Sequence, residues 1–258
     1  MQTLIRDGVA LCYAEAGAAG EGGVPLVFVP GGSCDWWSFH HQLEHFAPSR
    51  RSISLDLRGH GGSDKPHQPY TMAAYADDVA WVIAQLGLDR PVVVGHSMGG
   101  AIALQLAADH PEATRAIVLD DPAPVTDNRA GFGQMLAAFA KHGVDSTRRR
   151  AFRNFFLPDF DEALLAEVLE RATQTPDHVF ISEIEGLRDW DGAAIARQCQ
   201  VPVLHIAAAY PTCSPAALAE AIPHAVTGQT VGAGHFNMLE VPDQVNAMIA
   251  QFLRHYVA

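Results

Sequence analysis

The residues best suited to chemistry lie in the segment Gly95-His96-Ser97-Met98-Gly99-Gly100, which follows the apolar run 91–94 and opens a stretch rich in Ala and Leu. A serine on a tight turn from strand to helix needs small neighbours two positions to either side, and Gly95 and Gly99 meet that need. Such a turn lifts the hydroxyl clear of the sheet. It also places it at a helix N-terminus, where backbone N–H groups and the helix dipole favour negative charge. The pattern predicts that Ser97 is a nucleophile, although a glycine-rich turn with a chance serine would look the same.

A base for this nucleophile is expected near the end of the chain. A serine hydroxyl attacks well only when a neighbouring imidazole accepts its proton. His235 lies in the segment Gly232-Ala233-Gly234-His235-Phe236, between a weak strand pattern at 227–231 and the final helical pattern at 241–256. The chain has 13 histidines, so a histidine alone carries little information. His235 is predicted to be the base because it follows the serine and a candidate acid along the chain and lies on a glycine-bounded loop before the final helical pattern.

Acyl transfer also needs two N–H donors for the developing oxyanion. The residue after the nucleophile, Met98, should supply one of them. The other should come from the loop 30–33, which follows the apolar run 24–29. Gly32 is the first choice and Ser33 the second, although a simple turn after a strand would also explain two adjacent glycines.

The elements that must position these residues can be predicted from hydrophobic pattern. Short apolar runs bounded by Gly or Pro are typical of buried strands. They alternate with helical patterns, which indicates a mostly parallel sheet covered by helices on both faces. An Asp7-Gly8 turn predicts a hairpin at the start of the chain. The predicted strands are 24–29, 53–57, 91–94, 116–119, 203–207 and, more weakly, 227–231, and the predicted helices are 75–86, 98–108 and 241–256.

The alternation stops for about eighty residues between the strands at 116–119 and 203–207. This stretch is helical in pattern and rich in aromatic residues. We predict a helical cap at 126–197 inserted into a core formed by 1–125 and 198–258. The aromatic residues would form either a small separate core or part of a substrate pocket. Predicted substrate-binding residues, by position in the chain, are Trp36, Phe156, Trp190 and Phe236.

Three motifs together resemble the α/β-hydrolase superfamily, in particular its compact single-cap esterase- and lactonase-like members. They are the serine segment 95–100, the histidine segment 232–236 and the segment Asp56-Leu57-Arg58-Gly59-His60-Gly61-Gly62-Ser63-Asp64. The resemblance covers nearly the whole chain. It implies an α/β fold with a mostly parallel central sheet, flanking helices and a helical cap after strand 6.

The acid departs from the common pattern of that superfamily. Many members place an aspartate after the seventh strand, but here the stretch 202–212 contains no carboxylate. Some members place the acid at the end of the sixth strand, where this chain has Asp120 and Asp121. Neighbouring side chains on a strand point to opposite faces. We predict Asp121, which Pro122 should hold in an extended conformation, with Asp120 as the alternative.

Composition limits the partners. A net charge of −12 disfavours nucleic acid and anionic membrane surfaces. The four cysteines match no metal or redox motif, and neither a leader nor a membrane-length apolar run is seen, so a cytoplasmic protein without metal or cofactor is expected. A homodimer is possible.

The sequence thus predicts a serine hydrolase that cleaves a carboxylic ester or lactone of a small to medium hydrophobic substrate. The predicted catalytic residues are Ser97, His235 and Asp121, with Gly32 and Met98 as the oxyanion donors. The alternatives are a carbon–carbon bond hydrolase or a cofactor-free oxygenase, and less favoured, a small-molecule receptor on the same scaffold.

Overall fold

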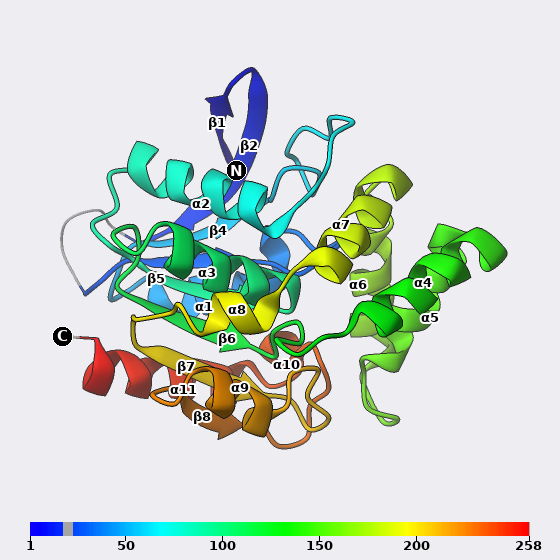
Figure 1. Ribbon diagram of the computed structural model, residues 1–258. Helices are drawn as coiled ribbons and strands as arrows, with labels where there is room; N and C mark the ends of the chain where they lie inside the picture. Colours follow the sequence, from blue (N-terminus) through cyan, green and yellow to red (C-terminus); the bar gives the residue numbers. More distant parts are fainter. Residues whose placement is uncertain (18–22, 258) are drawn as a thin grey trace.

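A single eight-stranded sheet forms the centre of the computed structural model, which describes residues 1–17 and 23–257 (Figure 1). The strand order is β1-β2-β4-β3-β5-β6-β7-β8. The first two strands form the predicted hairpin, β2 pairs antiparallel with β4, and all other pairs are parallel. The strands are β1 (Gln2–Arg6), β2 (Val9–Ala16), β3 (Leu26–Val29), β4 (Ser52–Leu55), β5 (Val92–His96), β6 (Ala116–Asp120), β7 (Val203–Ala207) and β8 (Val226–Gln229).

The central strands are apolar throughout because helices cover both of their faces. On β3, Leu26 and Phe28 belong to one buried cluster, and Val27 and Val29 to the other. The helices α2 and α3 pack on the face of Val27, and α1 and α11 pack on the face of Leu26. The prediction of a mostly parallel sheet between helical layers is therefore confirmed. These helices are α1 (His40–Phe46), α2 (Met72–Gln85), α3 (Met98–Asp109) and α11 (Pro242–Tyr256).

Five helices fill the chain between β6 and β7. The first four lie together beyond one end of the sheet, whereas α8 lies against α3 (Figure 1). The helices are α4 (Arg129–His142), α5 (Val144–Asn154), α6 (Glu162–Ala172), α7 (Asp177–Asp189) and α8 (Gly192–Ala196). We refer to α4–α7 as the inserted helices.

Three short elements remain. They are the 3₁₀ helix η1 (Trp36–Phe39), α9 (Pro215–Ala221) and α10 (Asn237–Glu240). All four cysteines are free. Within the described residues, no helix combines the length and the apolar character that crossing a membrane requires.

Candidate active site

Ser97 lies on a sharp turn between β5 and α3. Its backbone has φ 53° and ψ −118°, a conformation that non-glycine residues rarely adopt and that costs free energy. The turn is so tight that a Cβ atom at Gly95 would overlap the carbonyl oxygen of Gly99, and one at Gly99 would overlap that of Val29. This is the physical reason for glycine at both positions. The Ser97 side chain is half-buried, and within the described residues its hydroxyl forms no hydrogen bond.

His235 and Asp121 lie together at the carboxyl ends of the strands. His235 is on the loop between β8 and α10, and Asp121 directly follows β6. The Nδ1 atom of His235 is 2.5 Å from Oδ2 of Asp121, and both side chains are almost completely buried. Since a carboxylate accepts, Nδ1 carries the hydrogen and Nε2 is left as the acceptor nitrogen.

The loop after β7 supports the Asp121 carboxylate. The backbone N–H groups of Thr212 and Ala208 approach Oδ1 at 3.2 and 3.4 Å. The Thr212 hydroxyl donates to the carbonyl oxygen of Pro122 at 2.6 Å, which ties the two loops together. The loop that lacks a carboxylate in the sequence therefore supplies donors to the carboxylate on the neighbouring strand.

The backbone of Asp121 differs from the prediction. Pro122 should favour an extended residue before it, but Asp121 has φ 39°, in the left-handed region. Its N–H still donates to the carbonyl oxygen of Ile206 at 2.8 Å, so the chain must turn sharply just beyond the sheet to aim the carboxylate at His235. Aspartate tolerates this conformation better than most residues, and the contacts with Thr212 fix it.

Asp120 has a different environment from its neighbour. Its side chain is fully buried. Burial raises the pKa of the Asp120 carboxyl well above its usual value, and the charge of Asp121 raises that pKa further. The hydrogen bond from His235 goes to Asp121.

His96 and Phe155 hold the backbone of His235 from two sides. The Nε2 atom of His96 donates to the carbonyl oxygen of His235 at 2.9 Å, and the N–H of His235 donates to the carbonyl oxygen of Phe155 at 2.7 Å. Burial lowers the pKa of His96 well below its usual value, and the nearby His235 lowers it further, so His96 is neutral. Sequence analysis assigned no role to either residue.

Two backbone amides flank the Ser97 side chain. Met98 is the first residue of α3, so its N–H has no acceptor within that helix. A Cβ atom at Gly31 would lie 3.1 Å from Cβ of Ser97, so the loop 31–33 passes directly over the serine. The amide of Ser33 donates to Nε2 of His60, 3.0 Å away, so of the two predicted loop donors only Gly32 remains.

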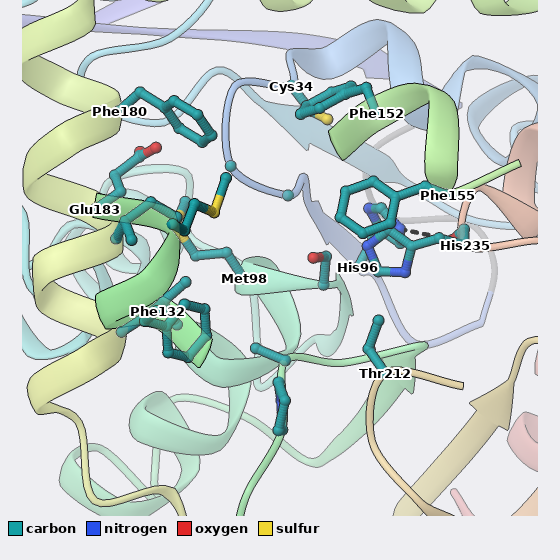
Figure 2. A pocket seen from close by; sticks show the side chains of 18 of the residues that line it. Cys34, His96, Met98, Phe132, Phe152, Phe155, Phe180, Glu183, Thr212 and His235 are labelled. Atoms are coloured by element: carbon teal, nitrogen blue, oxygen red, sulfur yellow. Dashed lines mark hydrogen bonds between the residues drawn. The ribbon is translucent and has the colours of Figure 1, made fainter. Parts of the chain in front are cut away.

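A cavity of about 330 Å³ opens over Ser97 and His235. Its wall is mostly apolar, and helices of the insertion supply much of it: Phe132 and Met135 from α4, Phe152 from α5, and Phe180, Ile184 and Leu187 from α7 (Figure 2). Its size and apolar lining are typical of small-molecule sites. Cys34 also lines the cavity, but burial raises the pKa of its thiol to about 12, so the thiol is protonated at neutral pH.

One charged group of the inserted helices faces this cavity. Glu183 on α7 is fully buried, and its Oε1 atom accepts from the hydroxyl of Tyr75 at 2.6 Å and lies 2.9 Å from Nε2 of His60. Burial lowers the pKa of His60, but the charge of Glu183 outweighs this effect, so the His60 pKa is above its usual value. The pair is thus a buried carboxylate beside a histidine whose protonated form that carboxylate favours.

The structure brings together most, but not all, of the predicted residues. Ser97, His235, Met98, Gly32 and Phe236 line one cavity, and Asp121 contacts His235 from behind.

The other three predicted substrate-binding residues do not line the cavity, so these predictions are corrected. Phe156 stacks on Phe236, with ring centroids 5.1 Å apart, and packs into the core. The indole N–H of Trp190 donates to Gln105 on α3 at 2.8 Å. Trp36 packs against the buried cluster to which α1 contributes. In each case packing against the core determines the orientation of the ring.

Comparison with known proteins gives the family. Residues 24–242 match the family model described as the alpha/beta hydrolase fold, so the chain belongs to that family. AB hydrolase superfamily protein YisY of Bacillus subtilis is 28% identical over 250 residues, which are 89% of this chain and 91% of that protein. Epoxide hydrolase 4 of Mus musculus is 32% identical over 174 residues, which are 66% of this chain but 45% of that protein.

A solved structure of Est816, described as an N-acyl homoserine lactone degrading enzyme, has a TM-score of 0.83 and 27% identity. The match covers 97% of this chain and 100% of that chain. Hydrolysis is the class of reaction that these comparisons support.

Proposed function

We propose that this protein is a serine hydrolase that cleaves carboxylic esters or lactones through an acyl-enzyme on Ser97. The observation that carries the proposal is the hydrogen bond between Asp121 and His235 beside Ser97 at the carboxyl ends of the strands, with Ser97 and His235 lining one apolar cavity. Asp121 is buried behind His235 and accepts from it, whereas Ser97 and His235 open onto the cavity. The similarity to a lactone-degrading enzyme supports the same substrate class.

In the first half of the reaction, Nε2 of His235 accepts the Ser97 proton while Oγ attacks the carbonyl carbon. Asp121 keeps the hydrogen of His235 on Nδ1 and stabilises the imidazolium that forms. The N–H groups of Gly32 and Met98 donate to the oxyanion. Unliganded hydrolases often have a long contact between serine and histidine that shortens when substrate binds, which fits the unpaired hydroxyl of Ser97.

In the second half, His235 gives its proton to the leaving alkoxide oxygen as the carbon–oxygen bond breaks. A water molecule then passes a proton to Nε2 and attacks the acyl-enzyme, which releases the acid and restores the Ser97 hydroxyl. No external oxidant or reductant is needed for this cycle.

The identity of the nucleophile favours carbonyl substrates over epoxides. Attack of a serine hydroxyl on an epoxide would form an ether, which water does not cleave under these conditions. Attack on an ester or lactone forms an ester, which the oxyanion donors and His235 can hydrolyse. The similarity to an epoxide hydrolase over 66% of this chain is therefore interpreted as shared fold rather than shared reaction.

The test is hydrolysis of a panel of p-nitrophenyl esters and simple lactones by the wild-type protein and by Ser97→Ala. Ser214→Ala, at the start of α9 and outside the cavity, is the matched control. We expect wild-type turnover that is lost by at least about 10³-fold in Ser97→Ala and kept in Ser214→Ala. Turnover by Ser97→Ala within tenfold of the wild-type rate would contradict the proposal.

A further inference from the structure

Glu183 has one carboxylate oxygen with a complete set of partners and one with none. Oε1 contacts Tyr75 and His60, whereas Oε2 has no hydrogen-bond partner in the described chain although the side chain is fully buried. A buried carboxylate oxygen without a donor costs free energy. A group of this kind in a cavity wall indicates a ligand that supplies the missing donor.

The Oε2 atom of Glu183 lies beside the loop 31–33. A Cβ atom placed on Gly32 would be 3.5 Å from Oε2. Since a carbon–carbon bond is about 1.5 Å long, Oε2 is at most about 5 Å from the Cα atom of Gly32. Glu183 is also among the residues that line the cavity over Ser97. A substrate whose oxyanion sits at Gly32 therefore passes within reach of Oε2.

The position of His235 determines which half of the substrate meets Glu183. The leaving oxygen must lie near His235, because it receives its proton from Nε2. Glu183 and Phe180 lie on the opposite side of the cavity from Phe155 and His235 (Figure 2). The acyl half, which points away from the leaving group, extends toward Glu183.

The partners of Oε1 keep the Glu183 carboxylate in place. Tyr75 on α2 donates to Oε1, and Nε2 of His60, on the glycine-rich loop after β4, lies 2.9 Å from Oε1, so the carboxylate is fixed from the core although it belongs to an inserted helix. Protonation of His60, which the charge of Glu183 favours, offsets that charge and limits the repulsion between Glu183 and an oxyanion at Gly32. The carboxylate can thus act as an acceptor without blocking ester chemistry.

We propose that Oε2 of Glu183 is a specificity-determining acceptor that binds a hydrogen-bond donor, such as an amide N–H or a hydroxyl, on the acyl half of the substrate. This inference rests on the proposed esterase or lactonase function and narrows it. Preferred substrates carry a donor a few bonds from the scissile carbonyl. Acyl chains that end in a carboxylate are disfavoured by the like charge.

The test uses matched p-nitrophenyl esters. The esters that carry a donor are those of N-acetylglycine, N-acetyl-β-alanine and N-acetyl-γ-aminobutyrate, called the amide esters. Each is paired with the keto ester in which a CH₂ group replaces the N–H. We expect the wild-type protein to prefer at least one amide over its ketone by about tenfold or more in kcat/KM, as for a hydrogen bond to a charged group.

Two variants then test whether the preference for the amide ester depends on Glu183. In Glu183→Gln, the amide oxygen should keep the contacts with Tyr75 and His60, which places the NH₂ group at the Oε2 position. The NH₂ group of the introduced glutamine then faces the N–H of the substrate, and two donors repel each other. We therefore expect the ratio of kcat/KM for the amide ester to kcat/KM for the keto ester, the amide-to-ketone ratio, to fall below one. The matched control Glu185→Gln makes the same change at an exposed position of α7 outside the cavity, and it should keep the amide preference within about threefold. The ratio cancels any general loss of activity.

The outcomes separate the two proposals. Ser97-dependent turnover with an amide-to-ketone ratio near one in the wild-type protein overturns the role of Glu183 and leaves the esterase proposal intact. A preference that survives in Glu183→Gln also overturns it. If no amide ester and no keto ester is hydrolysed in a way that depends on Ser97, the proposed function itself is overturned. The wild-type ratio decides the matter even if a variant does not fold.

Discussion

Asp120 and Asp121 are adjacent identical residues whose surroundings give them different chemistry. Asp121 accepts from His235 and from the N–H groups of the loop after β7, which stabilise its charge. Asp120 is buried where its pKa is raised. The sequence could place an acid at the end of β6 but could not fix which of the two contacts His235, because the left-handed turn at Asp121 depends on contacts with Thr212, 91 residues away.

We expect Asp121→Asn to lower kcat by about 10⁴-fold, because an amide would favour the wrong tautomer of His235. Asp120→Asn, the matched control, does not touch the His235 ring and should lose far less. The measurement is kcat with the most reactive ester of the panel. The acid assignment fails if the large loss appears in Asp120→Asn instead.

The raised pKa of Asp120 also predicts a pH dependence of stability. Between the unfolded pKa of about 3.9 and the higher folded pKa, the folded state binds more protons than the unfolded state. Stability from this group is therefore lost as the pH rises through that window, by at most about 1.4 kcal/mol per pH unit. Asp120→Asn should remove this slope.

Urea unfolding of the wild-type protein and Asp120→Asn at a series of pH values would measure the effect. The difference in the free energy of unfolding should grow in favour of the variant from about pH 5 to pH 7. A difference that stays constant over this range would show that Asp120 ionises normally in the folded state.

At the scale of elements, strand ends and turns create the site, and the strained turn between β5 and α3 is its most constrained part. Ser97 adopts a positive φ because β5 and α3 must be joined without room for a longer loop. Glycine adopts such a conformation at little steric cost. We expect Ser97→Gly to be more stable than Ser97→Ala by about 1–3 kcal/mol, while both variants are inactive. Chemical unfolding of the two variants tests this, and equal stability would mean that the turn is not strained.

The loop 232–236, which carries His235, is held by the end of α5. A Cβ atom at Gly234 would overlap the carbonyl oxygen of Phe155, which is also the acceptor for the N–H of His235. Gly234→Ala should therefore displace His235, destabilise the protein by about 1–3 kcal/mol and lower kcat strongly.

Gly133→Ala is the matched control for that change, because a Cβ atom there meets nothing within 4 Å. Gly133 lies within α4, so alanine should stabilise the protein by about 0.5–1 kcal/mol and leave kcat unchanged. Similar behaviour of the two variants in kcat would contradict the coupling between Phe155 and His235.

Elements of regular pattern could be predicted well from sequence. The strand 203–207 matches β7, and the predicted helix 98–108 differs from α3 by one residue. Apolar runs and turn residues carry this information locally. The short α9 has no strong amphipathic pattern and received no prediction.

At the scale of the whole molecule, the cavity over Ser97 lies between the core and the inserted helices. Its wall combines residues from α4, α5 and α7 with the loops after β3, β5 and β8. Sequence indicates an aromatic insertion but not which rings face inward: Phe155 lines the cavity, whereas its neighbour Phe156 packs on Phe236. Glu183 was also missed, because a glutamate in a helix normally indicates a solvent-exposed face.

The size of the cavity predicts a limit on acyl length. Each methylene that still fits should raise kcat/KM by up to about fourfold, the equivalent of about 0.8 kcal/mol. Activity should then fall once the 330 Å³ cavity is full. Ile184→Ala, which enlarges the cavity on the side formed by α7, should move the optimal acyl length to longer chains. A series of p-nitrophenyl esters measures this, and an unchanged optimum would mean that acyl chains do not enter this cavity.

The central claim is that Ser97 carries the acyl group during turnover. Mass spectrometry of the protein, quenched during turnover of a p-nitrophenyl ester, tests it most directly. We predict a protein mass increased by one acyl group, located by peptide mapping to the segment 95–100, and absent in Ser97→Ala. An ester that turns over without a Ser97-bound acyl group, or an acyl group found on another residue, would contradict the account.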